Sequence, residues 1–206
     1  MKAVILAGGR GTRLAPYTTV FPKPLMPVGG VPILEVIVRQ LKTHGVTEVV
    51  LCVGYLRSLL EAYFGRGERV GLPMSYSYEE TPLGTAGPIG LVPDLNDTFI
   101  VMNGDLLTTL DYSKMVDFHR THGGIATVGL ADKSVNIDLG VIETTKDHII
   151  ENYIEKPRLS YKVSMGIYVF QPEVLDYVRG QGRLDLPDAG SLDGQPSPCT
   201  SFSGTD

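Results

Sequence analysis

The sequence contains no tryptophan and only two cysteines, Cys52 and Cys199, among its 206 residues. Two thiols cannot form a disulfide scaffold, and neither the cysteines nor the four histidines stand at the CxxC or HExxH spacing of a metal site. Near the start, the longest apolar run covers only residues 3–7, which is too short for a signal peptide or a membrane span. These absences predict a cytoplasmic protein in a reducing compartment.

The chain also has fewer basic than acidic residues: 18 Lys and Arg and 23 Asp and Glu give a net charge of −5. A surface with this balance is not built generally for nucleic acid or acidic lipid, so we expect neither nucleic acid nor a membrane as partner. Apolar residues make up 43% of the chain, which suffices for the core of one ordinary domain and argues against disorder for most of its length.

Short apolar runs alternate along the chain with segments of helical period. This rhythm is typical of βαβ units, and it predicts an α/β fold with a Rossmann-like, mostly parallel sheet covered by helices on both faces. Strands are expected at residues 2–7, 48–55, 74–79, 98–103, 124–131, 137–143, 148–154 and 163–170. Helices are expected at residues 31–45, 56–65, 111–122 and 172–179.

The composition changes near the end of the chain. Residues 189–206 contain no Lys or Arg, and 11 of these 18 residues are Ser, Gly, Thr or Pro without apolar periodicity. Such a stretch cannot supply a core face, so we expect a disordered or loosely draped tail. Residues 1–188 are expected to form the folded domain.

The sequence directly after the first expected strand is rich in glycine, since residues 6–14 read Leu-Ala-Gly-Gly-Arg-Gly-Thr-Arg-Leu. Glycines let backbone N–H groups approach an anion closely, and a loop at the carboxyl end of a strand opens into the crevice of an α/β sheet. Arg10 and Arg13 add two guanidinium groups, which favour a polyphosphate site. The alternative is a plain glycine turn between two elements.

Two familiar glycine loops do not fit this segment. A P-loop requires Lys and then Ser or Thr after its last glycine, whereas Thr12 and Arg13 follow Gly11. A dinucleotide-binding loop requires a helix at once and an acidic residue at the end of the second strand. Four prolines between residues 16 and 27 exclude that helix, and the second strand ends Val-Gly-Tyr. A nicotinamide-dependent dehydrogenase is therefore disfavoured.

The local sequence is expected to hold two charged residues, Lys23 and Asp105, in defined positions. Lys23 lies between Pro22 and Pro24, so a stiff extended backbone presents its ammonium group. Asp105 follows an apolar strand, and in an open α/β sheet that carboxyl end faces the crevice, where a Mg²⁺ ligand belongs. The alternatives are a solvated lysine in a proline-rich loop and an aspartate that caps a turn.

Further short motifs follow along the chain: Glu79–Gly87, Asn103–Asp105, Leu139–Val141, Glu155–Pro157 and Met165–Tyr168. With the glycine-rich loop and the Phe-Pro-Lys-Pro-Leu segment at residues 21–25, the chain resembles the sugar-phosphate nucleotidyltransferases, also called NDP-sugar pyrophosphorylases. The motifs occur in the order of that family, over residues 1–188. The segment Glu79–Gly87 (Glu-Glu-Thr-Pro-Leu-Gly-Thr-Ala-Gly) is most similar to the mannose-1-phosphate guanylyltransferase branch, close to the glucose-1-phosphate nucleotidyltransferases.

The resemblance implies the nucleotide-diphospho-sugar transferase-like fold and a reaction in which a nucleoside triphosphate and a sugar 1-phosphate give an NDP-sugar and pyrophosphate. It implies catalytic roles for Arg13 and Lys23, with Mg²⁺ held by Asp105. The residues that it implies for nucleotide binding are Leu6, Gly8, Gly9, Gly11, Thr12, Glu79 and Gly84. It implies sugar-phosphate binding by Gly140, Glu155 and Lys156, for which a β-bulge and an exposed salt-bridging pair are the alternatives.

The sequence departs from the family after residue 188. Relatives carry a Trp-x-Asp-x-Gly-like segment whose Asp is a second metal carboxylate, and this chain has no Trp and no such segment. We therefore expect a C-terminally incomplete domain, with residues 189–206 as a tail outside the family pattern. A non-catalytic nucleotide-binding regulatory subunit, or an inactive truncated homologue, is the alternative to an active enzyme. Formation of a homo-oligomer stays open.

Overall fold

The structure, a computed structural model, describes residues 1–189 and 199–203. A seven-stranded sheet runs through the molecule in the order β11-β7-β10-β6-β1-β4-β5. Its strands are β1 (Lys2–Leu6), β4 (Glu48–Val53), β5 (Met74–Tyr78), β6 (Phe99–Asn103), β7 (Ala126–Asn136), β10 (Arg158–Phe170) and β11 (Cys199–Ser203). Strands β5, β4, β1 and β6 are parallel neighbours, whereas β10 is antiparallel to β6 and β7. The predicted α/β class is confirmed.

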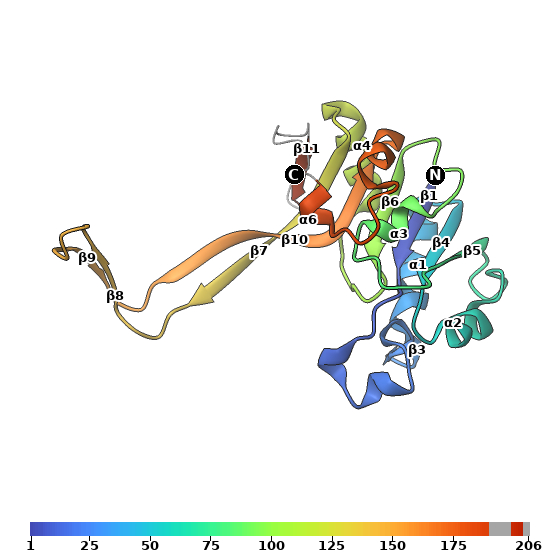
Figure 1. Cartoon of the computed structure of the whole chain (residues 1–206), viewed down its shortest axis with the longest axis horizontal. Helices are drawn as coiled ribbons and strands as arrows, with labels where there is room; N and C mark the ends of the chain where they lie inside the picture. The colour runs from blue at the N-terminus through green and yellow to red at the C-terminus, as the bar shows by residue number, and fades with distance from the viewer. Residues whose placement is uncertain (190–198, 204–206) are drawn as a thin grey trace.

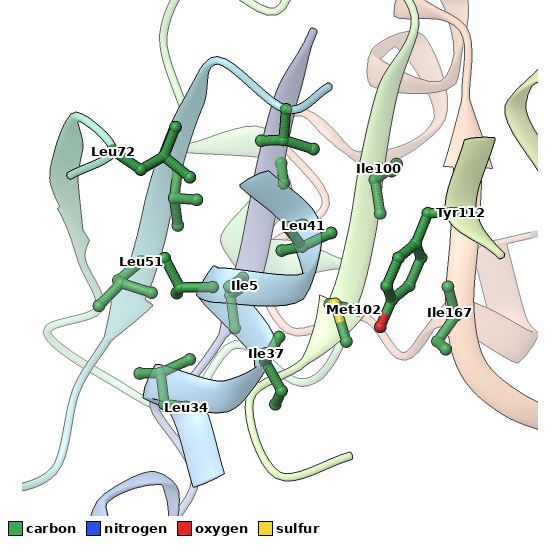
Figure 2. Packing of buried hydrophobic residues seen from close by; sticks show 14 of the residues in the cluster. Ile5, Leu34, Ile37, Leu41, Leu51, Leu72, Ile100, Met102, Tyr112 and Ile167 are labelled. Atoms are coloured by element: carbon green, nitrogen blue, oxygen red, sulfur yellow. The ribbon is translucent and has the colours of Figure 1, made fainter. Parts of the chain in front are cut away.

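Helices cover both faces of this sheet (Figure 1). They are α1 (Ile33–Thr43), α2 (Arg57–Phe64), α3 (Gly87–Gly90), α4 (Tyr112–His122), α5 (Leu175–Val178) and α6 (Leu186–Ala189). Apolar residues of α1, α2 and α4 form one buried cluster with Ile5 of β1, and Figure 2 shows Ile37 and Leu41 of α1 beside it. Residues of α3 and α5 form the second cluster, with Val4 on the opposite face of the same strand. Alternation along β1 therefore supplies both core layers. No helix of residues 1–189 is long and apolar enough to cross a membrane.

Local sequence explains where several elements begin and end. Asp111 caps α4, because its Oδ1 accepts the N–H of Lys114 at 3.0 Å. Gly65 ends α2 at a φ of 53°. The proline-rich segment after β1 forms only short pieces: η1 (Thr12–Leu14), η2 (Tyr17–Thr19), η3 (Lys23–Leu25), β2 (Pro27–Val28) and β3 (Val31–Pro32). A further 3₁₀ turn, η4 (Pro172–Val174), precedes α5.

Strands β7 and β10 extend beyond the sheet as a two-stranded arm, which we define as residues 131–164 (Figure 1). Its far end carries a hairpin of β8 (Val141–Thr144) and β9 (Ile150–Ile154). The predicted strands at 124–131 and 163–170 are too short, because β7 runs to Asn136 and β10 begins at Arg158. The predicted strand at 137–143 begins too early, because β8 begins only at Val141. Both faces of the arm are exposed, so its strands lack the alternation of apolar and polar residues by which their pairing could be recognised.

The structure also corrects the expectation for the end of the chain. Cys199–Ser203 form β11, which lies parallel to β7, and Phe202 is buried with only 3% of its surface exposed. The open edge of β7 offers backbone hydrogen bonds to any extended segment, so this strand needed no apolar period of its own. The prediction that this part of the tail supplies no core face is wrong. Residues 190–198 and 204–206, which the same prediction covers, lie outside the described residues.

Candidate functional site

A cavity of about 380 Å³ opens at the carboxyl ends of β1 and β6, beside the loop that follows β5. This is the edge of a parallel sheet where ligands bind in open α/β folds. The lining includes nine of the residues that the sequence singled out: Leu6, Gly8, Gly9, Gly11, Arg13, Lys23, Glu79, Gly84 and Asp105. Residues that are up to about 100 positions apart in the chain thus meet in one pocket, as the motifs predict.

The glycine-rich loop is fixed at both ends and is tightly surrounded at Gly8 and Gly11. The N–H of Ala7 donates to the carbonyl of Cys52 at 2.8 Å, which continues the sheet into the loop. A Cβ at Gly8 would collide with the carboxylate of Glu79. Gly11 has a φ of +60°, and its carbonyl accepts the hydroxyl of the buried Thr18 at 2.9 Å. Space therefore favours glycine at Gly8, whereas at Gly11 both space and the left-handed backbone conformation favour it.

Basic and acidic side chains meet on the floor of the pocket. Lys23 forms an ion pair with Asp105, and both side chains are only partly exposed. Arg13 is exposed at the pocket edge, and neither it nor Arg183 forms an ion pair among residues 1–189 and 199–203. The lining holds three basic and two acidic side chains, so it favours an anionic ligand.

Glu79 follows β5 and turns its carboxylate towards the loop at residues 82–88. Its Oε2 accepts the N–H of Leu83 at 3.1 Å, and a Cβ at Gly8 would meet its Oε1. Burial raises the pKa of Glu79 above its ordinary value, and the hydrogen bond from Leu83 opposes that shift in part. The pocket therefore presents a carboxylate acceptor between Gly8 of the glycine loop and Leu83.

Arg183 lines the same pocket and was missed by the sequence analysis. The segment around it is held against the loop after β5, because Leu184 donates its N–H to the carbonyl of Leu83 at 2.9 Å. Asp185 accepts the N–H of Thr85 through Oδ1 at 3.0 Å. No motif surrounds Arg183, so the contact with residues 83–86 was the only signal, and it exists only in three dimensions.

The structure does not bring four of the predicted site residues into this pocket. Thr12 belongs to η1 and is exposed outside the lining. Gly140, Glu155 and Lys156 lie on the arm, where Glu155 accepts a hydrogen bond from the hydroxyl of Tyr153 at 3.3 Å. Figure 1 shows the hairpin that carries them at the far end of the arm, away from the rest of the molecule.

Arg10, the second arginine of the glycine loop, faces a neighbouring hollow of about 300 Å³. Its guanidinium lies over the ring of Tyr55, 6.0 Å from the centroid. The hollow shares Gly8 and Glu79 with the main pocket but contains neither Lys23 nor Asp105. Only one of the two loop arginines therefore faces the main pocket.

The pocket residues fit a magnesium ion that is held mainly by a ligand. Among the described residues, no group of three or more His, Cys, Asp or Glu side chains could hold a metal. Mg²⁺ needs only one or two carboxylates and takes its other ligands from phosphates and water. Asp105, with 26% of its side chain exposed at the pocket floor, can be such a carboxylate.

Comparison with known proteins agrees with this geometry. Residues 2–188 match the protein family described as "Nucleotidyl transferase". A UTP–glucose-1-phosphate uridylyltransferase from Synechocystis is 37% identical over 207 residues, which cover 90% of this chain and 53% of that protein. Mannose-1-phosphate guanyltransferase beta-A from Xenopus laevis is 39% identical over 187 residues, covering 87% and 52%. The chain spans about half the length of the curated relatives it matches.

Solved structures give the same picture of the fold. A putative glucose-1-phosphate thymidylyltransferase from Bacillus anthracis, in complex with a sucrose, superposes with a TM-score of 0.78 and 29% identity, over 98% of this chain and 86% of that one. HddC from Yersinia pseudotuberculosis superposes with a TM-score of 0.72 and 23% identity, over 98% and 89% of the two chains. The latter similarity supports the fold alone.

Proposed function

We propose, because this chain belongs to the nucleotidyl transferase family, that it transfers a nucleotidyl group from a nucleoside triphosphate to a sugar 1-phosphate. The observation that carries the proposal is the meeting of the glycine loop, Arg13, Lys23 and Asp105 in one pocket. A plain glycine turn would not need these charges beside it. A non-catalytic binding role is not favoured, because the cations for phosphate chemistry are present together.

The reaction is a displacement at phosphorus. An oxygen of the sugar phosphate forms a bond to the α-phosphorus, the bond from that phosphorus to the α,β-bridging oxygen breaks, and pyrophosphate leaves with the electron pair. The protein aligns the reactants and neutralises their charge, because little covalent help is needed. Backbone N–H groups of the glycine loop and Arg13 bind the triphosphate, and Lys23 faces the transferred phosphate.

Asp105 would hold Mg²⁺ together with phosphate oxygens and water. The ion, when bound, neutralises negative charge on the phosphates that Asp105 would otherwise repel. The ion pair with Lys23 holds the carboxylate at the pocket floor before the nucleotide arrives. Lys23 thus positions Asp105 and becomes available to phosphate once that carboxylate has another cation.

We assign guanine as the base because of Glu79. Guanine presents two adjacent N–H donors, at N1 and N2, which a carboxylate accepts side by side. Uracil and thymine present one N–H between two carbonyl oxygens, which a carboxylate repels. The preferred pair is accordingly GTP and a hexose 1-phosphate, with mannose 1-phosphate ahead of glucose 1-phosphate.

The sugar phosphate would be bound from the arm, by Gly140, Glu155 and Lys156, in keeping with the family motifs. A carboxylate next to a fixed ammonium suits a polyhydroxylated anion. The arm must then approach the pocket during the reaction. We place the protein in the cytoplasm, because Cys52 and Cys199 are free thiols, and we leave homo-oligomer formation open.

Pyrophosphate release tests the proposal. The assay contains Mg²⁺, each of four nucleoside triphosphates, and mannose 1-phosphate or glucose 1-phosphate. We expect release with GTP that requires a sugar phosphate, that Asp105→Asn abolishes, and that Asp117→Asn, an exposed aspartate on α4, leaves intact. Absence of release from the unaltered protein with every pair, or full release from Asp105→Asn, would contradict the proposal.

A further inference from the structure

Two charged side chains of opposite sign, Glu79 and Arg183, line the pocket from the segments that meet at the loop after β5. Both segments are held to the same residue of the loop after β5. Glu79 accepts the N–H of Leu83 at 3.1 Å, and the carbonyl of Leu83 accepts the N–H of Leu184, next to Arg183, at 2.9 Å. The segments that carry the two charged side chains therefore meet at Leu83, and both side chains line the pocket.

The pocket surface at Gly84 suits a flat ring. Gly84 has a φ of +80°, and a Cβ there would meet Oδ1 of Asp185 at 2.8 Å, so this position is restricted to glycine and presents no side chain. Pro82 and Pro88 line the pocket beside it and have no N–H to donate. A base can lie on this apolar stretch with its polar edges directed at the two charged groups.

Guanine has edges of the matching polarity. N1–H and N2–H are donors that fit a carboxylate, whereas O6 and N7 are adjacent acceptors that fit an arginine fork. We infer that Arg183 determines the specificity for guanine by donating hydrogen bonds to O6 and N7 while Glu79 accepts from N1 and N2. This inference rests on the proposed function, because it requires that a nucleotide occupies the pocket.

A contact of Arg183 with the triphosphate is the competing role. Arg13 and Lys23 come from the segment after β1, whereas Arg183 is held through Leu184 to the loop that carries Gly84. Because of this attachment to the loop at Gly84, we assign the guanidinium of Arg183 to the base. Adenine presents an amino group where guanine has O6, so the same fork would meet a donor and reject it.

The test measures dissociation constants by isothermal titration calorimetry, which does not depend on turnover. Three nucleotides are compared: GTP, 7-deaza-GTP, which lacks the N7 acceptor, and ITP, which lacks the 2-amino group. The unaltered protein should bind 7-deaza-GTP and ITP each about tenfold more weakly than GTP. Arg183→Gln should bind GTP and 7-deaza-GTP equally, and it should keep the preference for GTP over ITP.

The crossed variant makes the assignment specific. Glu79→Gln should lose the discrimination between GTP and ITP and keep the discrimination between GTP and 7-deaza-GTP. Arg179→Gln is the matched control, because Arg179 is an exposed arginine in the same segment that does not line the pocket, and its three constants should equal those of the unaltered protein. Circular dichroism of each variant checks that the fold is retained.

Two failures are distinguishable. If the unaltered protein binds no nucleoside triphosphate, the proposed function fails and Arg183 has no base to contact. If GTP binds but 7-deaza-GTP binds as tightly, or if Arg183→Gln weakens GTP, 7-deaza-GTP and UTP by one common factor, only the inference about Arg183 is overturned. An equal loss of affinity for all three nucleotides would indicate that Arg183 contacts the phosphates instead of the base.

Discussion

At the scale of single residues, Gly84 holds the wall on which the base is proposed to lie. Alanine there must adopt a φ near +80° and would press its Cβ against the carbonyl of Leu184. We expect Gly84→Ala to lower the free energy of unfolding by about 2–4 kcal/mol, from the positive φ together with the steric overlap. Urea unfolding measures this change, and nucleotide binding should weaken in the same variant.

Gly180→Ala is the matched control for that measurement. Gly180 has a φ of +77°, and a Cβ at this position meets nothing within 4 Å. It should cost only about 1–2 kcal/mol, which is the effect of the left-handed conformation alone. Equal losses at both positions would show that the contact between Gly84 and Leu184 contributes nothing.

Motif residues at the ends of the parallel strands could be predicted to reach the pocket, whereas Arg183 could not. Gly8 and Asp105 each follow a strand, and the carboxyl ends of parallel strands meet at one edge of a sheet. Lys23 lies in the proline-rich segment that continues from the first of these strands. Arg183 reaches the pocket because its neighbour Leu184 pairs with Leu83, a contact between segments about 100 residues apart. No periodicity in a sequence reports such a pairing.

At the scale of elements, α4, β7 and β11 are joined by a chain of hydrogen bonds through the buried His119 and Thr127. Gln171 contributes Nε2 at 3.0 Å from Nε2 of His119, and Nδ1 of His119 lies 2.8 Å from the hydroxyl of Thr127. Thr127 in turn bonds to the hydroxyl of Thr200 on β11. With its amide nitrogen as donor, Gln171 requires an acceptor at Nε2, so the imidazole is neutral with its proton on Nδ1.

This arrangement predicts a dependence of stability on pH. Burial lowers the pKa of His119 below its ordinary value, and the charge of Arg120 adds to the effect. Below about pH 6.5, His119 is protonated in the unfolded chain but stays neutral in the folded protein, so acidification favours unfolding. The free energy of unfolding should be constant above that pH and should fall as the pH decreases towards 5.

Urea unfolding at several pH values, with the unaltered protein and His119→Gln, measures this contribution. The decline between pH 6.5 and 5 should be smaller in His119→Gln and unchanged in His122→Gln, whose histidine is exposed on the same helix. The buried Glu35 acts in the same direction, because the hydrogen bond from Tyr63 lowers its pKa below 4.5, but its contribution falls in a more acidic range. Identical slopes for His119→Gln and the unaltered protein would refute the assignment.

The elements of the parallel core were predictable, and those outside it were not. Strand β4 and helix α1 lie where apolar runs and helical spacing placed them, because both bury their apolar residues in the same core. Strand β11 pairs through its backbone with the open edge of β7, which any extended sequence can do. The arm has both faces exposed, so its strands lack the alternation that reveals a buried face.

At the scale of the whole molecule, the arm separates two parts of one proposed site. Glu155 and Lys156 lie on it, whereas Lys23 and Asp105 lie in the pocket. The arm also exposes apolar side chains that a free surface rarely gathers: Leu139, Ile142, Ile149, Ile150, Tyr153 and Ile154. An isolated two-stranded ribbon is marginally stable in water, so packing against the body would stabilise it.

The base of the arm has the features of a hinge. The pairing of β10 with β7 shifts register between Ser164 and Tyr168, and Gly166 between them has a φ of +73°. A bulge and a glycine concentrate bending at one place in a ribbon. We therefore predict that GTP and mannose 1-phosphate together draw the hairpin of the same chain towards the pocket.

Fluorescence energy transfer between two dyes measures this movement. One dye is attached to the thiol that Lys146→Cys introduces on the hairpin, and the other is placed near the pocket. The exposed Cys199 is replaced by Ser so that labelling is specific. Energy transfer should increase when both substrates are present. Lys156→Gln should raise the KM for mannose 1-phosphate while it leaves GTP binding unchanged.

Mixing Lys23→Ala with Lys156→Gln tests whether the hairpin acts on its own chain. Recovery of activity in the mixture would mean that the arm reaches the pocket of a second copy instead. In the energy-transfer experiment, an unchanged signal would mean that the sugar phosphate is bound without Lys156.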